Sequence, residues 1–173
     1  MRYSPSCNCC GGGGGGCCSG TIPNHLTVQI VMSTTVEFQP APGYTCAFEC
    51  ADLTGTWSLT AEAGQGCWWS YETTFDKVVG SCADGDYETW PICFKLHYDP
   101  DVGANGTLYL WITASTCSAG FSIGSVLLLY AEGNPDSLVC AEWDTEQALN
   151  PTGTTPASNC DINDVTSVTV SAI

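Results

Sequence analysis

The chain has 173 residues, with 13 cysteines and with 18 acidic side chains against three basic ones, so its net charge is −15. This charge argues against nucleic acid and anionic membranes as partners, because both require clustered Lys and Arg to displace counterions. Charged residues make up 12% of the chain, against roughly 25% in a typical domain, so ion pairs cannot be the main stabilising device.

Residues 1–20 form a low-complexity arm around the stretch "CNCCGGGGGGCC". Glycine has no side chain to bury and loses maximal backbone entropy on ordering, so a flexible tether is one interpretation. The other is an extended, polyproline-II-like strand that packs against copies of itself from neighbouring subunits. Under that second hypothesis five cysteines are candidates for bonds between subunits: Cys7, Cys9, Cys10, Cys17 and Cys18. Five is odd, so at least one thiol is free, metal-bound or bonded to another chain.

The cysteine count predicts an oxidising environment. Residues 1–18 contain no apolar stretch of the kind that a secretory signal peptide needs, and the sequence has no apolar run of about 18 residues that would predict a transmembrane helix. Thiols that bind metal inside a cell, or a chain that has been processed, would reconcile these observations. So would a protein that is made in a cytosol, assembles there and oxidises after release by lysis, which is the explanation we favour. We therefore expect an extracellular or virion location.

Short β-branched and aromatic segments begin after residue 20, and turn sequences separate them. In chain order the expected strands are 26–32, 34–39, 56–61, 67–73, 92–98, 107–113, 125–131, 137–143 and 165–172. "DTEQAL" at 144–149 is expected to form a single helical turn, and "NPTGTTP" at 150–156 a turn. Eight or nine strands at this spacing predict an all-β sandwich or barrel. Of the two we expect a single antiparallel β-sandwich over residues 21–173 that follows the arm.

Alternation along the strands predicts which side chains face the core. Trp57, Leu59 and Ala61 should share one face. Trp68 and Trp69 are adjacent, so they should point to opposite faces, with one of them exposed or at an interface. The segments "TLYLWIT" and "VLLLYA" are apolar on both faces, so each should be a central strand covered on both sides, or one of them should face a partner.

Eight cysteines lie in the predicted domain, an even number that allows four intrachain disulfides in 105 possible pairings. They are Cys46, Cys50, Cys67, Cys82, Cys93, Cys117, Cys140 and Cys160. Zinc is the alternative, but a structural site requires two ligand pairs, and "CAFEC" has no second pair nearby in the domain. We therefore expect disulfides.

The sequence provides no catalytic constellation, so we do not expect an enzyme. His97 lies in a predicted strand without an evident activating partner, and it should face solvent. The loop "DPDVGANG" places Asp99, Asp101 and Asn105 at a spacing that can hold Ca²⁺. The alternative for this loop is a turn built by Asp, Asn and Gly, and no other cofactor is indicated.

The chain has six tryptophans, which raises carbohydrate binding, because sugars stack on aromatic faces. The competing interpretation is that these rings lie in the core or at a subunit interface. Surface glycans are therefore a second class of expected partner, beside copies of this chain and other structural subunits.

The motifs "CADLTGTWSLT", "GCWWSYE" and "CDINDVTSVTVSAI", together with "TIPNHLTVQI" after a glycine–cysteine arm, are similar to those of a group of uncharacterised proteins. The chain resembles cysteine-rich β-domain proteins encoded near structural genes of phages and prophages. The resemblance implies strands and a structural role in a virion or another extracellular assembly, and it brings no catalytic residue with it.

These observations predict a structural protein of an extracellular assembly, such as a virion tail, fibre or capsid-decorating component, whose arm mediates subunit contacts. A carbohydrate-binding or adhesin module is the alternative.

Overall fold

The computed structural model describes residues 23–32, 53–64, 67–78, 87–99, 102, 106–119, 126–133, 146–153 and 165–172, with the backbone alone for 75–78, 87–90 and 126. The described residues form eight strands and one short 3₁₀ turn, and no α-helix occurs among them. The elements are β1 (His25–Met32), β2 (Gly55–Ala61), β3 (Trp68–Val78), β4 (Tyr87–Asp99), β5 (Thr107–Ala114), η2 (Cys117–Ala119), β6 (Val126–Gly133), β7 (Gln147–Gly153) and β8 (Val165–Ala172).

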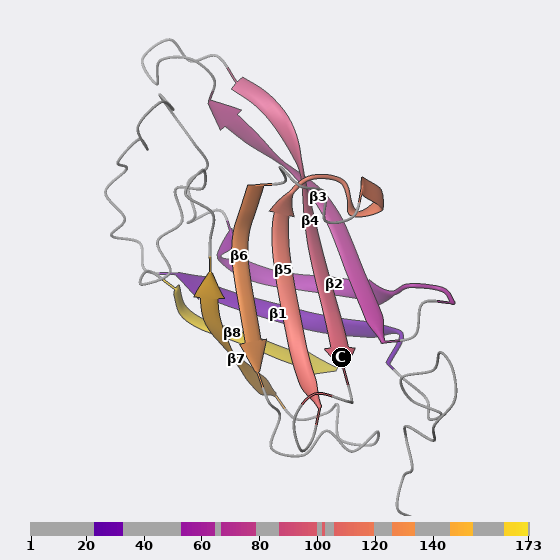
Figure 1. Cartoon of the computed structure of the whole chain (residues 1–173). Coiled ribbons are helices and arrows are strands. Elements are labelled where there is room, and N and C mark those ends of the chain that lie inside the picture. The colour runs from indigo at the N-terminus through magenta and orange to yellow at the C-terminus, as the bar shows by residue number, and fades with distance from the viewer. Residues whose placement is uncertain are drawn as a thin grey trace, which may run out of the picture.

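The strands close into an antiparallel barrel in which each pairs with the next along the chain and β8 pairs with β1. Figure 1 shows β3, β4, β5 and β6 side by side, with β1, β2 and β8 crossing behind them. The all-β class is confirmed, but the expected β-sandwich is wrong, because the strands form a closed barrel. Both architectures require the same inward–outward alternation, so the pattern alone does not reveal whether the edge strands meet.

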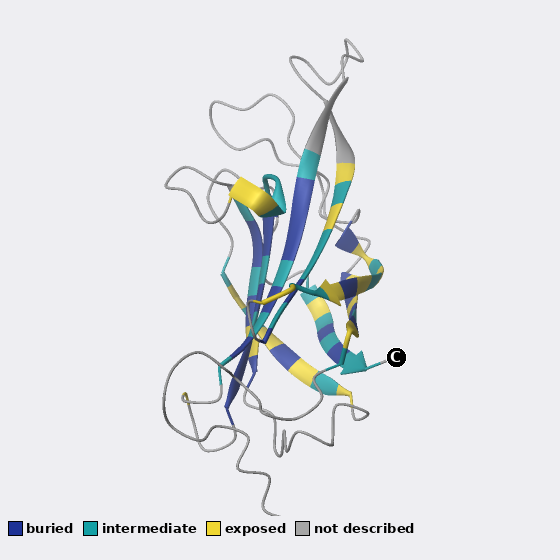
Figure 2. Ribbon diagram, turned by 90° about the vertical axis from the view of Figure 1, so that its right-hand side faces the viewer, coloured by how far each residue is buried: buried dark blue, intermediate teal, exposed yellow. Residues whose placement is uncertain are grey.

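The barrel interior is filled by aliphatic and aromatic side chains from every strand. Figure 2 shows the resulting alternation of buried and exposed positions along several strands. The largest fully buried side chains are Trp69, Phe94, Leu26, Ile30, Leu59, Ile92, Leu96, Leu108, Leu110, Ile112, Leu128 and Leu129. Burying one such side chain contributes about 1.5–3 kcal/mol, so this core is the main source of stability.

Most of the predicted strands are confirmed, with bounds that differ by a few residues. The segments at 26–32, 56–61, 67–73, 92–98, 107–113, 125–131 and 165–172 all correspond to strands. Segments 34–39 and 137–143 lie outside the described residues, as do the arm at 1–20 and its five cysteines. Trp69 is buried while Trp68 is half-buried on the outside of the barrel, so the prediction that they point to opposite faces is confirmed.

The expectation for residues 147–153 is wrong. The predicted helical turn "DTEQAL" and the predicted turn that begins at "NPTG" overlap with β7, which pairs with β6 and β8. Pro151 pairs with Ala131 next to a register shift in β6. An irregular position of this kind tolerates a residue that lacks a backbone N–H, so tertiary pairing overrides the local turn signal.

β3 and β4 are the longest strands. They stay paired with each other beyond the point at which β5 stops pairing with β4. β5 pairs with β4 from Cys93 to Asp99, whereas β3 pairs with it as far as Tyr87. Figure 1 shows the two strands projecting past their neighbours as a hairpin. Pro91 lies just beyond the last residue paired with β5, at a position where a missing N–H is tolerated.

β2 and β3 form the shortest strand pairing in the barrel, since only Thr60 and Ala61 of β2 are paired with β3. Trp57 fills the space beside it: its ring centroid lies 4.8 Å from that of Phe94 and 5.9 Å from that of Tyr71. Its indole N–H donates to the Leu53 carbonyl at 3.1 Å. Side-chain packing therefore supports the wall of the barrel where backbone pairing is short. Trp57, Leu59 and Ala61 all pack in or against the core, as predicted.

Candidate functional site

Three of the eight domain cysteines are among the described residues. Cys93 and Cys117 are joined by a disulfide, with their Cα atoms 5.0 Å apart, and Cys67 is also disulfide-bonded. The remaining candidates, Cys46, Cys50, Cys82, Cys140 and Cys160, lie outside the described residues. The sequence left the pairing open, the Cys93–Cys117 bridge is present, and the expectation of four intrachain disulfides stays a prediction.

The Cys93–Cys117 disulfide joins the outer face of β4 to η2, the turn that follows β5. The Cys117 backbone N–H donates to Oε2 of Glu72 at 2.7 Å, so β3 also holds this turn. Together these contacts cover one end of the outer face of β3 and β4. The rest of that face carries the candidate site.

The strand registers align five outward-facing side chains in a row across the sheet. Row A runs from β3 to β7 through Trp68, His97, Tyr109, Glu132 and Asn150, each a direct cross-strand partner of the next. Adjacent strands are about 4.8 Å apart, so four steps span about 19 Å. The first three members are aromatic and the last two are polar.

A parallel row lies beside it. Row B consists of Ser70, Lys95, Trp111, Tyr130 and Gly153, again as successive cross-strand partners. Trp111 and Tyr130 therefore continue the aromatic surface on β5 and β6. We call the five rings of the two rows the aromatic surface; its members are Trp68, His97, Tyr109, Trp111 and Tyr130.

The rings of the aromatic surface are stacked on one another, and all of them are half-buried. The centroids of Trp68 and His97 lie 4.0 Å apart with an interplanar angle of 13°. Trp111 links the rows, with centroid distances of 5.8 Å to Trp68, 5.6 Å to Tyr109 and 5.8 Å to Tyr130. Near-parallel offset rings are a favourable aromatic arrangement, so the five rings hold one another in place.

Lys95 is the one basic residue whose side chain the structure describes. Its Nζ lies 3.4 Å from Glu62 Oε1 and 5.3 Å from the centroid of the Trp68 ring. The ammonium group is therefore engaged by a carboxylate and an aromatic face, which reduces its availability to an anionic ligand.

Two ionisable members of the aromatic surface are held in their neutral forms. Burial lowers the pKa of His97 below its ordinary value of 6.5, and the nearby Asp99 carboxylate opposes this effect in part. Burial raises the pKa of Tyr130, and the hydrogen bond to Glu132 and the charge of that carboxylate act in the same direction. His97 faces outward as predicted, although it is packed between Trp68 and Tyr109.

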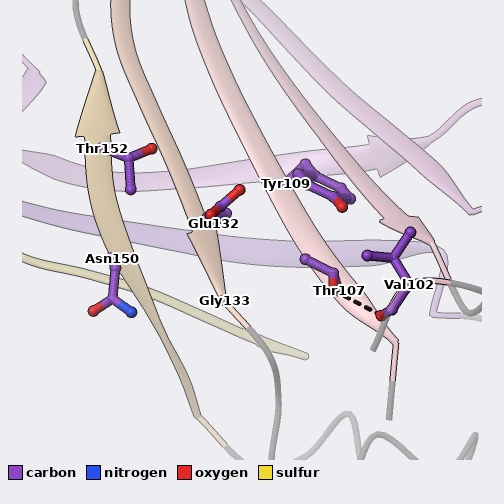
Figure 3. Close-up of a pocket in the computed structure, with 7 residues that line it drawn as sticks. All are labelled: Val102, Thr107, Tyr109, Glu132, Gly133, Asn150 and Thr152. Carbon is purple, nitrogen blue, oxygen red and sulfur yellow. Dashed lines mark hydrogen bonds between the residues drawn. The ribbon is translucent and has the colours of Figure 1, made fainter. Parts of the chain in front are cut away.

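A groove of about 300 Å³ adjoins the aromatic surface on its β5–β7 side. Figure 3 shows the lining residues, with Tyr109 and Thr107 on β5 and the polar side chains of β6 and β7 beside them. The groove is lined by Val102, Thr107, Tyr109, Glu132, Gly133, Asn150 and Thr152. Tyr109 belongs to both features, so the aromatic surface and the groove are continuous.

One hydrogen bond connects the groove to row B. The Tyr130 hydroxyl donates to Oε2 of Glu132 at 2.7 Å. On the opposite wall, the Thr107 hydroxyl donates to the Val102 carbonyl at 2.8 Å and fixes the chain that precedes β5. The groove therefore combines an aromatic wall with oriented carboxylate, amide and hydroxyl groups.

The calcium candidate is only partly described. Asp99 ends β4 and is half-buried, while Asp101 and Asn105 lie outside the described residues. Among the residues that the structure describes, no group of three or more His, Cys, Asp or Glu side chains is arranged to hold a metal ion. The calcium hypothesis stays a prediction.

Sequence reasoning named His97 but missed the groove. Glu132, Asn150 and Thr152 belong to no motif, and the local sequence at 150–153 predicts a turn. The signal that could have located them is register: once β5, β6 and β7 are paired, Tyr109, Glu132 and Asn150 must lie side by side.

No helix in the described part of the chain is long and apolar enough to cross a membrane. No protein-family model, no curated protein and no solved structure matches the chain. The resemblance to phage-associated β-domain proteins therefore stays an expectation.

Proposed function

We propose that the protein binds carbohydrate on the outer face of β3–β7. The observation that carries the proposal is the continuity of the stacked aromatic surface with a groove of polar side chains, which meet at Tyr109. Ligand sites typically combine aromatic walls with a few oriented polar groups. This surface has both, on the outside of a barrel whose interior is occupied by core side chains.

A saccharide suits this combination because each sugar ring has an apolar face of C–H groups and a rim of hydroxyl groups. Aromatic rings accept the apolar face, while carboxylate, amide and hydroxyl groups exchange hydrogen bonds with the rim. Row A extends about 19 Å, which favours an oligosaccharide or a polymer chain over a single sugar.

Single-stranded nucleic acid also stacks on aromatic residues, but it requires a positively charged groove. The net charge of −15 and the engagement of Lys95 by Glu62 oppose that ligand. Cross-strand stacking also stabilises a sheet without any ligand. That explanation accounts for the rings, but it gives no role to the polar groove beside them.

The predicted role in an extracellular assembly rests on the cysteine count, on the lack of a signal-peptide pattern and on the arm at 1–20, which lies outside the described residues. That role stays a prediction. It is compatible with carbohydrate binding, since an adhesin module can belong to an assembly. β5 corresponds to the segment "TLYLWIT", which is apolar on both faces. Its outer face carries Tyr109 and Trp111, so a ligand on this face would be the partner expected for such a strand.

The test is binding of the full chain to an array of neutral and charged glycans, followed by titration of the glycans that are retained. Trp111→Ala removes the ring that links rows A and B, and Val31→Ala is the control, because Val31 is an exposed apolar residue on β1 (37% exposed). We expect Trp111→Ala to weaken binding at least tenfold and Val31→Ala to leave it unchanged.

Circular dichroism should confirm that both variants keep the barrel, and sedimentation should compare their oligomeric states. The proposal is wrong if the wild-type chain retains no glycan, or if Trp111→Ala binds as well as the wild type. A change of oligomeric state without a change in glycan binding would instead identify the aromatic surface as a subunit interface.

A further inference from the structure

We infer that the groove beside Tyr109 is a subsite that takes a neutral sugar residue through its hydroxyl groups and rejects anionic sugars such as uronic acids. This inference rests on the proposed carbohydrate binding and specifies the class of ligand. It follows from the hydrogen-bonding groups of the groove, from its charge, and from the way in which Glu132 is held.

The groove presents a set of acceptors and donors that complements neighbouring hydroxyls. Glu132 provides a carboxylate, Asn150 provides an amide that both donates and accepts, and Thr152 provides a hydroxyl. Glu132 and Asn150 are direct cross-strand partners, and both are exposed. Figure 3 shows them on adjacent strands, on the same side of the sheet as Tyr109.

Tyr130 is the positioning residue of this subsite. Its hydroxyl donates to Oε2 of Glu132, and its ring is stacked on Trp111 at 5.8 Å, so the carboxylate is tied to the ordered aromatic surface. An ionised carboxylate can accept several hydrogen bonds, two or more of them beyond the one from Tyr130. Hydrogen bonds from sugar hydroxyls to that charged acceptor are stronger than those between neutral groups.

The charge of the groove sets its selectivity. Among the described residues that line the groove, Glu132 is the only charged one, and none is Lys or Arg. Lys95 lies in row B and is engaged by Glu62. An anionic sugar would therefore meet a carboxylate with no compensating cation among the described lining residues, in a protein that already carries a net charge of −15. The repulsion should be largest at low ionic strength.

The experiment is calorimetric titration of the full chain with neutral hexasaccharides of glucose, xylose, mannose, galactose and N-acetylglucosamine. The galacturonic acid hexasaccharide serves as the anionic counterpart of the galactose one. The variants are Glu132→Gln, Tyr130→Phe and Asn150→Ala. Glu146→Gln is the matched control, because Glu146 is an exposed acid just before β7 and does not line the groove.

We expect the wild type to bind at least one neutral hexasaccharide and to bind the galacturonic acid one more weakly, with a gap that narrows between low salt and about 0.5 M salt. Glu132→Gln should weaken neutral binding about tenfold and reduce the discrimination against the acid. Tyr130→Phe and Asn150→Ala should each weaken neutral binding several-fold. Glu146→Gln should match the wild type.

The inference is overturned if the galacturonic acid hexasaccharide binds as tightly as the neutral ones, or if Glu132→Gln and Asn150→Ala both bind like the wild type. If those variants bind normally while Trp111→Ala loses binding, the subsite is wrong and carbohydrate binding on the aromatic surface stands. If the wild type binds none of these saccharides and retains no glycan on the array, both proposals fail together.

Discussion

Replacing Gly106 by alanine should damage the barrel far more than the same change at Gly64. Both glycines have positive φ, +81° for Gly106 and +74° for Gly64. They differ in their surroundings. A Cβ atom on Gly106 would lie 2.3 Å from Cε2 of Tyr98 and 2.4 Å from its hydroxyl oxygen, whereas a Cβ on Gly64 would meet nothing within 4 Å.

The structure separates two contributions to the free energy of unfolding. The left-handed backbone costs a non-glycine residue about 1–2 kcal/mol at either position. At Gly106 the clash adds an overpacking cost of about 1–3 kcal/mol, because Tyr98 is 5% exposed and cannot swing into solvent. We therefore expect Gly64→Ala to lose about 1–2 kcal/mol and Gly106→Ala about 2–5 kcal/mol.

The assay is urea unfolding followed by tryptophan fluorescence, with circular dichroism as a second probe of the same transition. Alanine restricts the unfolded chain equally in both variants, so the difference between them isolates the clash with Tyr98. If the two variants unfold with free energies within about 0.5 kcal/mol of each other, Tyr98 does not pack against Gly106 as described and the reasoning fails.

Two further predictions concern the aromatic surface and its neighbouring disulfide. Replacing both Cys93 and Cys117 by alanine opens a loop with a sequence separation of 24 residues, and we expect a loss of about 3.5 kcal/mol in the free energy of unfolding from the entropy of that loop; a urea midpoint equal to that of the wild type would contradict this. Burial lowers the pKa of His97, so between the lowered value and the ordinary pKa of 6.5 the unfolded chain binds more protons than the folded chain. The contribution of His97 to stability is therefore complete above pH 6.5 and is lost as the pH falls toward the lowered pKa. His97→Phe keeps a ring between Trp68 and Tyr109 but cannot be protonated, so its urea midpoint should fall less than that of the wild type between about pH 7.5 and pH 5; equal falls would show that His97 does not couple to folding.

The alternation of apolar residues predicted most of the barrel wall from the sequence. In β5, Leu108, Leu110 and Ile112 face inward while Tyr109 and Trp111 face outward, as a period of two requires. The closure of the barrel could not be predicted from the sequence, because it depends on the pairing of β1 with β8. Nothing in the sequence of either strand specifies the other as its partner. β7 was missed because Asn150, Pro151 and Gly153 are residues typical of turns, and the pairing of β7 with its neighbours outweighs that preference.

The candidate site shows the same division between local pattern and long-range register. The separation of Trp68 from Trp69 followed from strand geometry alone. The continuity of Trp68, His97, Tyr109, Glu132 and Asn150 depends on four successive registers, and a shift of one residue in any strand would send its members to the core. The six tryptophans raise carbohydrate binding beside a core or interface role, and the sequence alone does not indicate which rings lie on the outer face.

The pairing of β1 with β8 also has a consequence during protein synthesis. Leu26 pairs with Ala172, so the partner strand of β1 is synthesised about 150 residues after β1 itself. At the usual rates of translation this takes about 7–30 s. During that interval Leu26, Val28 and Ile30 lack the cover of the completed core, and one edge of β1 is an open template for another chain. The hairpins β3–β4 and β4–β5 pair residues close in sequence and can form first. Nascent chains on neighbouring ribosomes would thus be most prone to associate through β1, and a chaperone that holds this strand until release would raise the yield of closed barrels.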